Sequence, residues 1–232
     1  MARPDRAVRI VATLVCLTYS AALYWSGITI EPDLRRSLAY LPGLAVLLVL
    51  AWDVQVWRWP GVHRLTSRPR LDGLWSATIQ PTAESHIPAG GNRGPISAYL
   101  AVSQTYWRFS ARLITKESQS STRAHFWFPS SAHDIEWVSF IYDNSPRQAY
   151  QHRSARHLGT CTLRPGSRNP GSLSAAYFTD RYTQGDIELT LLGRDGSVAA
   201  FREAAEKEAE LRDKSEKRQE RYARLRAKLP FI

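Results

Sequence analysis

The sequence predicts two N-terminal transmembrane α-helices, an all-β, eight-stranded antiparallel up-and-down barrel and a charged C-terminal α-helix. Three observations support this fold class. Two uncharged runs stand at the start of the chain, short stretches of alternating side chains follow, and the last part of the chain is dense in Lys, Arg, Glu and Asp. The predicted parts are a helical hairpin over 1–60, a basic linker over 61–70, a barrel over 71–193 and a charged helical tail over 198–230.

The two uncharged runs have lengths that suit a membrane. Ile10 to Ile30 contains 21 residues and would reach about 30 Å as an α-helix, which matches the apolar core of a bilayer. Ser37 to Trp52 contains 16 residues, which is short for a transmembrane helix. It becomes long enough to span a bilayer if the helix continues through Asp53 to Trp57. We predict spans over about 9–30 and 37–57. A signal peptide is the alternative for the first run, but a second apolar run so close behind argues against cleavage.

Arginines are distributed unevenly around these runs. Three precede the first run and four follow the second, whereas the loop between them has two that are offset by Glu31 and Asp33. Because basic residues accumulate on the cytoplasmic side of a membrane, both termini and the barrel are predicted to be cytoplasmic. The net charge of +10 fits this interpretation, and it also fits an anionic partner such as a nucleotide or an acidic lipid.

The barrel is predicted from short runs whose side chains alternate with a period of two. Eight strands form a cylinder that is either filled by side chains or holds one small ligand. A β-sandwich is the alternative architecture. We predict strands over 72–80, 96–103, 106–115, 123–128, 135–143, 157–164, 172–179 and 185–192, with a polar turn over 116–121 and a chain break at 144–146.

Motifs for catalysis or metal binding are weak. The chain has no phosphate-binding glycine loop, no nucleophile elbow and no Cys-x-x-Cys pair, and its six histidines do not repeat at metal-ligand spacing. His152 and His157 lie near one another, but alternation puts them on opposite faces of a continuous strand. We therefore predict no metal and no cofactor, and the residues alone leave a hydrolase of unrecognised type open. Cys16 and Cys161 fall in different segments, which predicts no disulfide and a reducing compartment.

Aromatic, polar and cationic side chains are interleaved along the predicted strands. Aromatic faces stack on bases and arginines pair with phosphates, so a nucleotide is a candidate ligand. The competing interpretation is that the aromatic side chains fill the core and that the arginines face solvent.

Several stretches resemble a known family. They are Gly73–Trp75, Ser103–Trp107, Thr115–Ser121, Phe140–Pro146, His157–Thr160 and Tyr177–Arg181, with Gly185 after them. In this order, behind two transmembrane helices, they are similar to the SMODS-associating two-transmembrane, β-strand-rich effectors of bacterial CBASS antiphage systems. The resemblance covers about residues 1–193 and leaves the charged tail outside.

The resemblance implies a ligand-gated membrane disruptor and not an enzyme. A CD-NTase enzyme would make a cyclic di- or trinucleotide, and the cytosolic barrel would bind it as the activating ligand. The effectors would then form homo-oligomers in the bacterial inner membrane and disrupt it, killing the infected cell; no DNA or RNA partner is expected. On the matching stretches, the residues predicted to touch the cyclic nucleotide are Gln104, Trp107, Tyr142, Asn144, His157, Tyr177, Thr179 and Arg181.

Three other functions stay open on the sequence. A membrane-anchored lipocalin-like carrier of a lipid, haem or another small apolar ligand predicts an apolar interior. A membrane-bound hydrolase predicts convergent Ser, His and acidic groups. A scaffold would use the charged tail to recruit a partner; that tail is otherwise a solvated helix, a short coiled coil or a helix on the inner leaflet.

Overall fold

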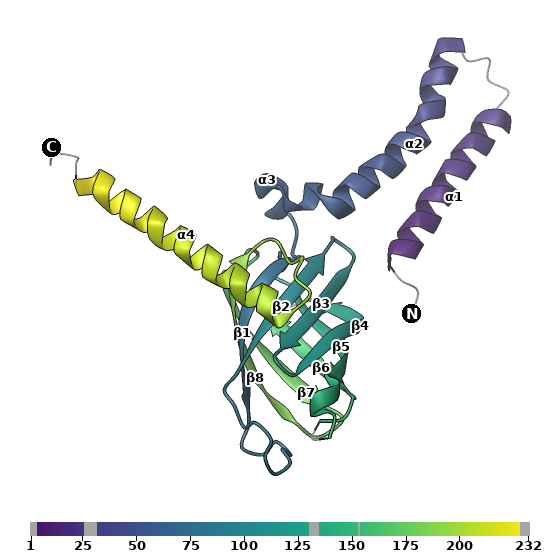
Figure 1. Cartoon of the computed structure of the whole chain (residues 1–232). Coiled ribbons are helices and arrows are strands. Elements are labelled where there is room, and N and C mark those ends of the chain that lie inside the picture. The colour runs from purple at the N-terminus through teal and green to yellow at the C-terminus, as the bar shows by residue number, and fades with distance from the viewer. Residues whose placement is uncertain (1–3, 26–31, 130–134, 153, 228–232) are drawn as a thin grey trace. The chain divides into compact units, whose positions relative to one another are not determined.

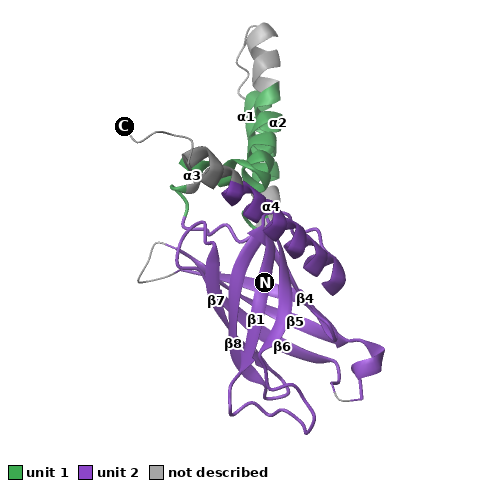
Figure 2. Cartoon of the chain, turned by 60° about the vertical axis from the view of Figure 1, so that its left-hand side comes forward, with its two compact units in different colours: residues 1–66, 105–108 green, residues 67–104, 109–232 purple. Residues whose placement is uncertain are grey.

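The computed structural model divides the chain into two compact units, coloured separately in Figure 2. One unit is residues 1–66 with 105–108, and the other is residues 67–104 with 109–232. The first unit is helical, and the second contains the barrel and the C-terminal helix. The structure describes residues 4–25, 32–129, 135–152 and 154–227.

The first unit contains two long helices, α1 (Pro4–Trp25) and α2 (Pro32–Val54). They are in contact where the Cys16 Sγ lies 3.7 Å from the carbonyl oxygen of Pro42. A 3₁₀ turn η1 (Val56–Arg58) and a short helix α3 (Pro60–His63) follow. Within the described ranges, no helix combines the length and apolarity that a membrane crossing requires. Of the predicted spans, residues 26–30 lie outside the described part of the chain.

Residues 105–108 belong to the helical unit although they connect two strands. The amide of Tyr106 donates to the carbonyl oxygen of Asp53 over 2.9 Å, and the amide of Trp107 donates to the Asp53 carboxylate over 3.1 Å. The Tyr106 ring meets Trp52 and Trp57 edge-on, at centroid distances of 5.6 and 5.9 Å. The strand predicted over 106–115 therefore begins only at Phe109.

Eight antiparallel strands close into a barrel in sequence order, as Figure 1 shows. The last strand pairs with the first, from Trp75 opposite Leu191 to Pro81 opposite Gly185, so the sheet has no free edge. This closure confirms the predicted barrel and excludes the sandwich. The strands are β1 (Gly73–Pro81), β2 (Ile96–Gln104), β3 (Phe109–Thr115), β4 (Ser118–Phe128), β5 (Trp137–Pro146), β6 (His157–Arg164), β7 (Ser172–Thr179) and β8 (Gln184–Gly193).

Large apolar side chains fill most of the interior. One cluster of buried residues includes Trp75, Phe109, Phe140 and Leu163, which come from β1, β3, β5 and β6. The rings of Phe109 and Phe140 lie 5.4 Å apart, and each fully buried side chain of this size contributes about 1.5–3 kcal/mol to the free energy of folding. The core therefore occupies the barrel itself, with the apolar side chains of successive strands directed inward.

Two polar stretches that were predicted as a turn and a chain break are strand. Ser118, Gln119 and Ser120 pair with Pro146, Ser145 and Asn144 in the β4–β5 ladder, and the Ser120 hydroxyl donates to the Asn144 side-chain oxygen over 2.8 Å. The predictions at 116–121 and 144–146 were wrong because each polar run supplies the hydrogen-bond partner of the other. The turn itself spans only Thr115 to Ser118.

The C-terminal helix α4 (Phe201–Ala227) rests on the outside of the barrel. Its first turns and the segment before it cover the outer face of β1–β3, where Leu74, Tyr99 and Ile114 are buried. The predicted tail began at residue 198, but Val198 precedes the helix and packs into this face instead. Residues 228–230 of the predicted tail lie outside the described part of the chain.

Two leucines of β6 provide a test of this core. Leu163 is 1% exposed inside the barrel, whereas Leu158 is 49% exposed on the outer face. Leu163→Ala should lower the free energy of unfolding by about 2–5 kcal/mol through lost burial and the remaining cavity. Leu158→Ala should change it by about 0.5 kcal/mol or less. Urea unfolding of both variants measures the difference, and equal midpoints would contradict the inward direction of Leu163.

Candidate functional site

The barrel has a cavity of about 380 Å³ at one end. This end is where β1, β3, β5 and β7 finish and where β2, β4, β6 and β8 begin. Its volume lies within the range of about 300–1,000 Å³ that small-molecule sites occupy. The strand residues that line it include Ile79, Ile96, Leu113, Ser118, Ser120, Asn144, His157, Tyr177, Thr179 and Ile187. We call it the mouth cavity.

The interior beneath the mouth cavity is closed. A void of about 20 Å³ lies there, lined by Phe140, Tyr142, Cys161 and Leu163 among others, and it has room for about one water molecule. Burial raises the pKa of the Cys161 thiol to about 12, so this side chain is a small neutral group. Inside the barrel, as far as the structure describes it, the space of nucleotide size therefore lies at the mouth.

Buried polar groups stand on the wall of the mouth cavity. Ser120 and Asn144, each 5% exposed, are joined by their 2.8 Å hydrogen bond across β4 and β5. Thr179 is 2% exposed, and its hydroxyl lies 2.7 Å from that of Thr183. The Thr179 oxygen also accepts the Thr183 amide over 3.2 Å, which fixes the turn between β7 and β8. These groups are held in place before any ligand binds.

Two tyrosines lie against glycines of the neighbouring strand. Tyr142 pairs with Gly159, where a Cβ would lie 2.3 Å from the ring atom Cζ. Tyr177 pairs with Gly185, where a Cβ would lie 2.9 Å from the ring atom Cε1. Burial raises the pKa of Tyr142 above its ordinary value, and burial with the nearby Asp186 raises the pKa of Tyr177 to about 12. Both phenols are therefore neutral and can donate a hydrogen bond.

His157 and Arg181 meet at the rim. The Arg181 Nη1 donates to the Ser154 hydroxyl over 3.0 Å and lies 3.5 Å from the His157 Nδ1. The same Nδ1 is 3.0 Å from the carbonyl oxygen of Ala155. Burial lowers the pKa of His157, and the Arg181 charge lowers it further, although the Ala155 contact opposes both. A neutral ring that donates from Nδ1 to Ala155 leaves Nε2 as an acceptor.

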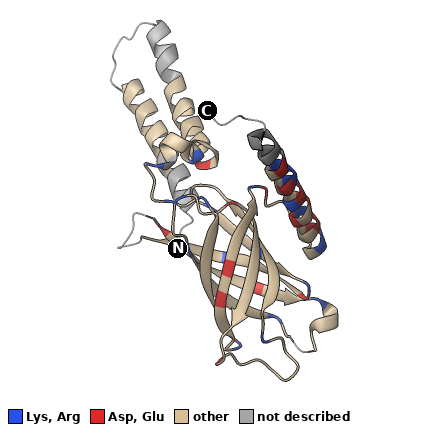
Figure 3. Ribbon diagram, turned by 90° about the vertical axis from the view of Figure 1, so that its left-hand side faces the viewer, with Lys and Arg blue, Asp and Glu red and all other residues tan. Residues whose placement is uncertain are grey.

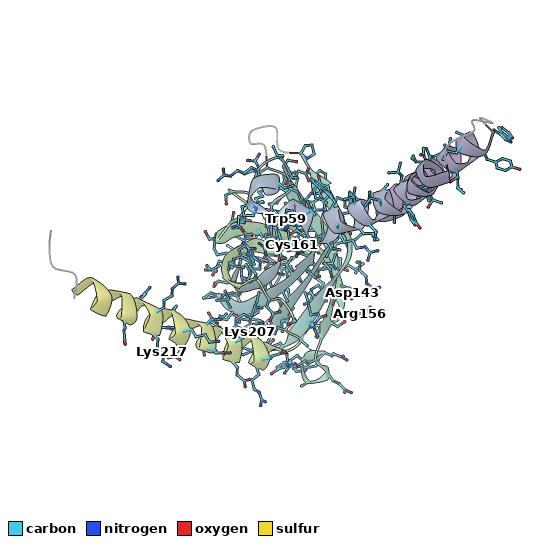
Figure 4. All side chains as sticks on the ribbon, turned by 90° about the horizontal axis from the view of Figure 1, so that it is seen from above. Trp59, Asp143, Arg156, Cys161, Lys207 and Lys217 are labelled. Carbon is cyan, nitrogen blue, oxygen red and sulfur yellow. The ribbon has the colours of Figure 1, made fainter. Side chains whose placement is uncertain are left out.

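An ion-pair cluster on the outer wall supports this rim. Arg156 Nε lies 2.8 Å from Asp143 Oδ1, and Arg123 Nε lies 3.1 Å from Asp143 Oδ2; Figure 4 shows Asp143 beside Arg156. Hydrogen bonds from Arg156 and then Arg123 hold the pKa of the Asp143 carboxyl well below its usual range. Because Asp143 faces outward between the inward Tyr142 and Asn144, the cluster ties the start of β6 to β4 and β5.

The structure brings together most of the predicted ligand contacts. Asn144, His157, Tyr177 and Thr179 line the mouth cavity, Tyr142 lines the void beneath it, and Arg181 stands beside His157. This convergence depends on closure of the barrel, because β5, β6 and β7 contribute different members.

Gln104 and Trp107 are not brought to this site. The Gln104 oxygen accepts the Leu71 amide over 2.7 Å, and its nitrogen donates to the Pro69 carbonyl over 2.8 Å, so it fixes the chain entering β1 at the opposite end of the barrel. Trp107 belongs to the helical unit through Asp53.

Sequence reasoning did not select several lining residues. Among them are Lys116, Ser120, Tyr150 and Thr183. The sequence signal that could have indicated Lys116 was the charged Lys116-Glu117 pair in a short polar stretch. That stretch was interpreted only as a turn. Ser120 carried no signal of its own, because its role depends on the long-range pairing with Asn144.

The contact between Gly159 and Tyr142 gives a mutational test. Gly159→Ala should overpack the wall and lower the free energy of unfolding by about 1–3 kcal/mol. In a Tyr142→Ala background the added methyl group has space, so the same substitution should have little effect. Gly171→Ala is the control, because nothing lies within 4 Å of a Cβ there. Thermal or urea unfolding of the four-member cycle measures the coupling, and an additive cycle would contradict the contact.

The lowered pKa of His157 predicts a pH effect with a defined sign. Between the folded-state pKa and the ordinary value of about 6.5, the unfolded chain binds more protons than the folded chain. The contribution of His157 to the free energy of unfolding is therefore fully present above pH 6.5. It is lost as the pH falls from about 6.5 through the folded-state pKa of His157. An NMR titration of the His157 ring should give a pKa below the ordinary value, and Arg181→Ala should raise it. A titration at or above the ordinary value would contradict the rim geometry.

Comparison with known protein families gives one match over the barrel. Residues 66–191 match the family described as Cap15, cyclic dinucleotide receptor domain. The match contains β1 to β7 and nearly all of β8, and it ends before α4. No curated protein matches the chain. Because more than half of the chain is matched by this model, the chain belongs to the Cap15 cyclic dinucleotide receptor family of CBASS effectors.

Proposed function

We propose that the mouth cavity binds a cyclic dinucleotide, and that binding drives self-association of the chain and disruption of the bacterial inner membrane. The observation that carries the ligand proposal is the convergence of Asn144, His157, Tyr177 and Thr179 on one cavity inside the family-matched region. The cavity lies at the open end of a barrel whose remaining interior is filled, which supports binding of the ligand at the mouth.

The side chains of the mouth fit the chemistry of a cyclic dinucleotide. Tyr177 offers an aromatic face for a base, and Asn144 and His157 offer hydrogen-bond partners for base edges. Arg181 at the rim and Lys116 in the lining offer cations for the two phosphates. Tyr142 stands one layer deeper and supports the floor against Gly159. We assign the chain a receptor role without catalysis.

The membrane part of the proposal rests on α1 and α2. Their apolar side chains have few partners within the helical unit: Leu14, Val15 and Leu17 are 56–62% exposed, and Leu47 and Leu48 are 63% and 61% exposed. Lipid would cover such side chains. With the arginine distribution, this supports a multi-pass protein whose termini and barrel face the cytoplasm.

The ligand can drive self-association only if its affinity for the assembled chain exceeds its affinity for the monomer. The cyclic dinucleotide, supplied by a CD-NTase enzyme, shifts the chain toward an assembled state if it binds that state more tightly than the monomer. Assembly of α1 and α2 in the inner membrane would then disrupt it and kill the infected cell.

The carrier hypothesis is a poorer fit to the geometry. A lipid or haem carrier needs a deep apolar chamber, whereas Trp75, Phe109 and Phe140 fill the interior beneath the mouth and leave about 20 Å³. The roomy part of the barrel has polar groups on its wall, including Ser120, Asn144 and Thr179.

A thermal-shift measurement on the full chain in detergent tests the ligand proposal. Cyclic di-AMP, cyclic di-GMP and cyclic GMP–AMP are added separately, with AMP and oleate as controls. A ligand that binds only the folded state raises the melting temperature, so we expect a shift with at least one cyclic dinucleotide and none with AMP or oleate. Shifts with oleate alone, or with no compound, would count against a cyclic dinucleotide receptor.

A matched pair of arginines tests the rim. Arg181→Ala removes a cation at the cavity and should weaken binding by about tenfold or more, since a hydrogen bond to a charged group is worth about 1.5–3 kcal/mol. Arg164 is exposed at the far end of β6, so Arg164→Ala should leave the affinity unchanged. Calorimetric titration measures both, and equal affinities would remove Arg181 from the site.

A further inference from the structure

α4 is attached to the barrel through one apolar cluster. The Phe201 ring lies 5.1 Å from the Tyr99 ring, and the Tyr99 hydroxyl donates to the Glu208 carboxylate over 2.5 Å. Burial and this carboxylate raise the pKa of Tyr99 above its ordinary value, so the hydroxyl remains a donor. The buried members of the cluster are Leu74, Tyr99, Ala101, Ile114, Val198 and Ala204. We call it the docking cluster.

Among the side chains of α4 that the structure describes, those between 201 and 211 take part in this attachment. Residues 212–220 are exposed, and their ion pairs are internal, as between Arg212 and Glu216 (3.1 Å) and between Asp213 and Lys217 (2.6 Å). Figure 3 shows acidic and basic residues interleaved along this helix. The docked state of α4 therefore depends on its first turns, where Phe201 and Glu208 contact Tyr99 and Lys207 pairs with Asp195 over 2.5 Å.

Lys116 lies at both the docking cluster and the mouth cavity. It occupies the tip of the β3–β4 turn, which is held by the Thr115 hydroxyl accepting the amides of Glu117 (3.2 Å) and Ser118 (2.9 Å). Lys116 lines the mouth cavity, and its Nζ lies 5.7 Å from the centre of the Phe201 ring. One cation therefore serves the ligand site and the first turn of α4.

An anionic ligand and the Phe201 ring compete for this cation. A lysine over an aromatic face at an exposed site is weakly attracted to the ring quadrupole. A hydrogen bond between an ammonium and a phosphate oxygen is stronger, because both partners are charged. A phosphate at the mouth would therefore draw the Lys116 ammonium away from Phe201.

We infer that Lys116 couples the mouth cavity to α4: binding of a cyclic dinucleotide recruits Lys116 and weakens the attachment of α4 to the barrel. This inference rests on the proposed function and adds its regulation. Ligand binding and the attachment of α4 are two coupled equilibria, and such coupling is reciprocal. If the ligand weakens the attachment of α4 by a given factor, loss of the Lys116–Phe201 contact tightens ligand binding by the same factor. α4 thus acts as a restraint on the ligand site, and the ligand weakens this restraint while the apolar members of the docking cluster stay in contact.

Two phenylalanines give the matched test. Phe201→Leu keeps an apolar side chain in the docking cluster but removes the ring beneath Lys116. It should tighten binding of the cyclic dinucleotide by about two- to fivefold, the range that an exposed cation–π contact supports. Phe126 is 39% exposed on the outer face of β4, so Phe126→Leu should leave the affinity unchanged. Binding is measured by calorimetric titration of the full chain with cyclic di-AMP, cyclic di-GMP and cyclic GMP–AMP.

Hydrogen exchange supplies an independent readout on the same protein. Addition of the bound cyclic dinucleotide should accelerate exchange of the amides at 201–208 in the wild-type chain, whereas Lys116→Met should abolish that acceleration. Wild-type binding with unchanged exchange at 201–208, or Phe201→Leu with unchanged or weaker affinity, would overturn the coupling alone. Absence of binding by the wild-type chain to all three compounds would overturn the proposed function, and the coupling with it.

Discussion

The pairing of β1 with β8 is the constraint on which the rest of this structure depends. It closes eight strands into a cylinder, and a cylinder of this size has space inside only where its side chains leave it. Trp75, Phe109 and Phe140 fill most of the interior, so the ligand-sized space is confined to one end. Without closure, Asn144, His157 and Tyr177 would lie along an open sheet and could not surround a ligand.

The pleat decides which side chains reach that space. Residues 142, 143 and 144 of β5 alternate: Tyr142 and Asn144 face the interior, and Asp143 faces outward to its two arginines. The alternation also explains why Gly159 lies beneath the Tyr142 ring, since cross-strand partners share a face. The ion-pair cluster outside and the polar groups inside are therefore consequences of one register, and a slip of one residue would exchange them.

The parts that were predicted from the sequence are those specified locally. β6 and β7 were found with their observed bounds, because the Pro- and Gly-containing stretch at 165–171 marks the turn between them. Ser118–Ser120 and Asn144–Pro146 were misread because their composition is that of turns, and only the long-range ladder between them makes them strand. Gln104 and Trp107 lie on a matching stretch, but the chain leaves the barrel there. Their partners, Pro69, Leu71 and Asp53, are distant in sequence and carry no local signal.

The attachment of α4 shows why a regulatory element can be added outside the family-matched region. The matched residues end at 191, and the docking cluster forms when Val198 and Ala204 cover apolar side chains on β1–β3 that face away from the interior of the barrel. We infer that α4 influences the mouth cavity through a residue that lies at both the cavity and the helix. Lys116 lines the cavity and contacts Phe201 of α4. Because the contact is weak compared with a charge-assisted phosphate contact, it can bias ligand binding without preventing it. A stronger contact, such as a buried ion pair, would hold Lys116 against α4 and close the site to an anion.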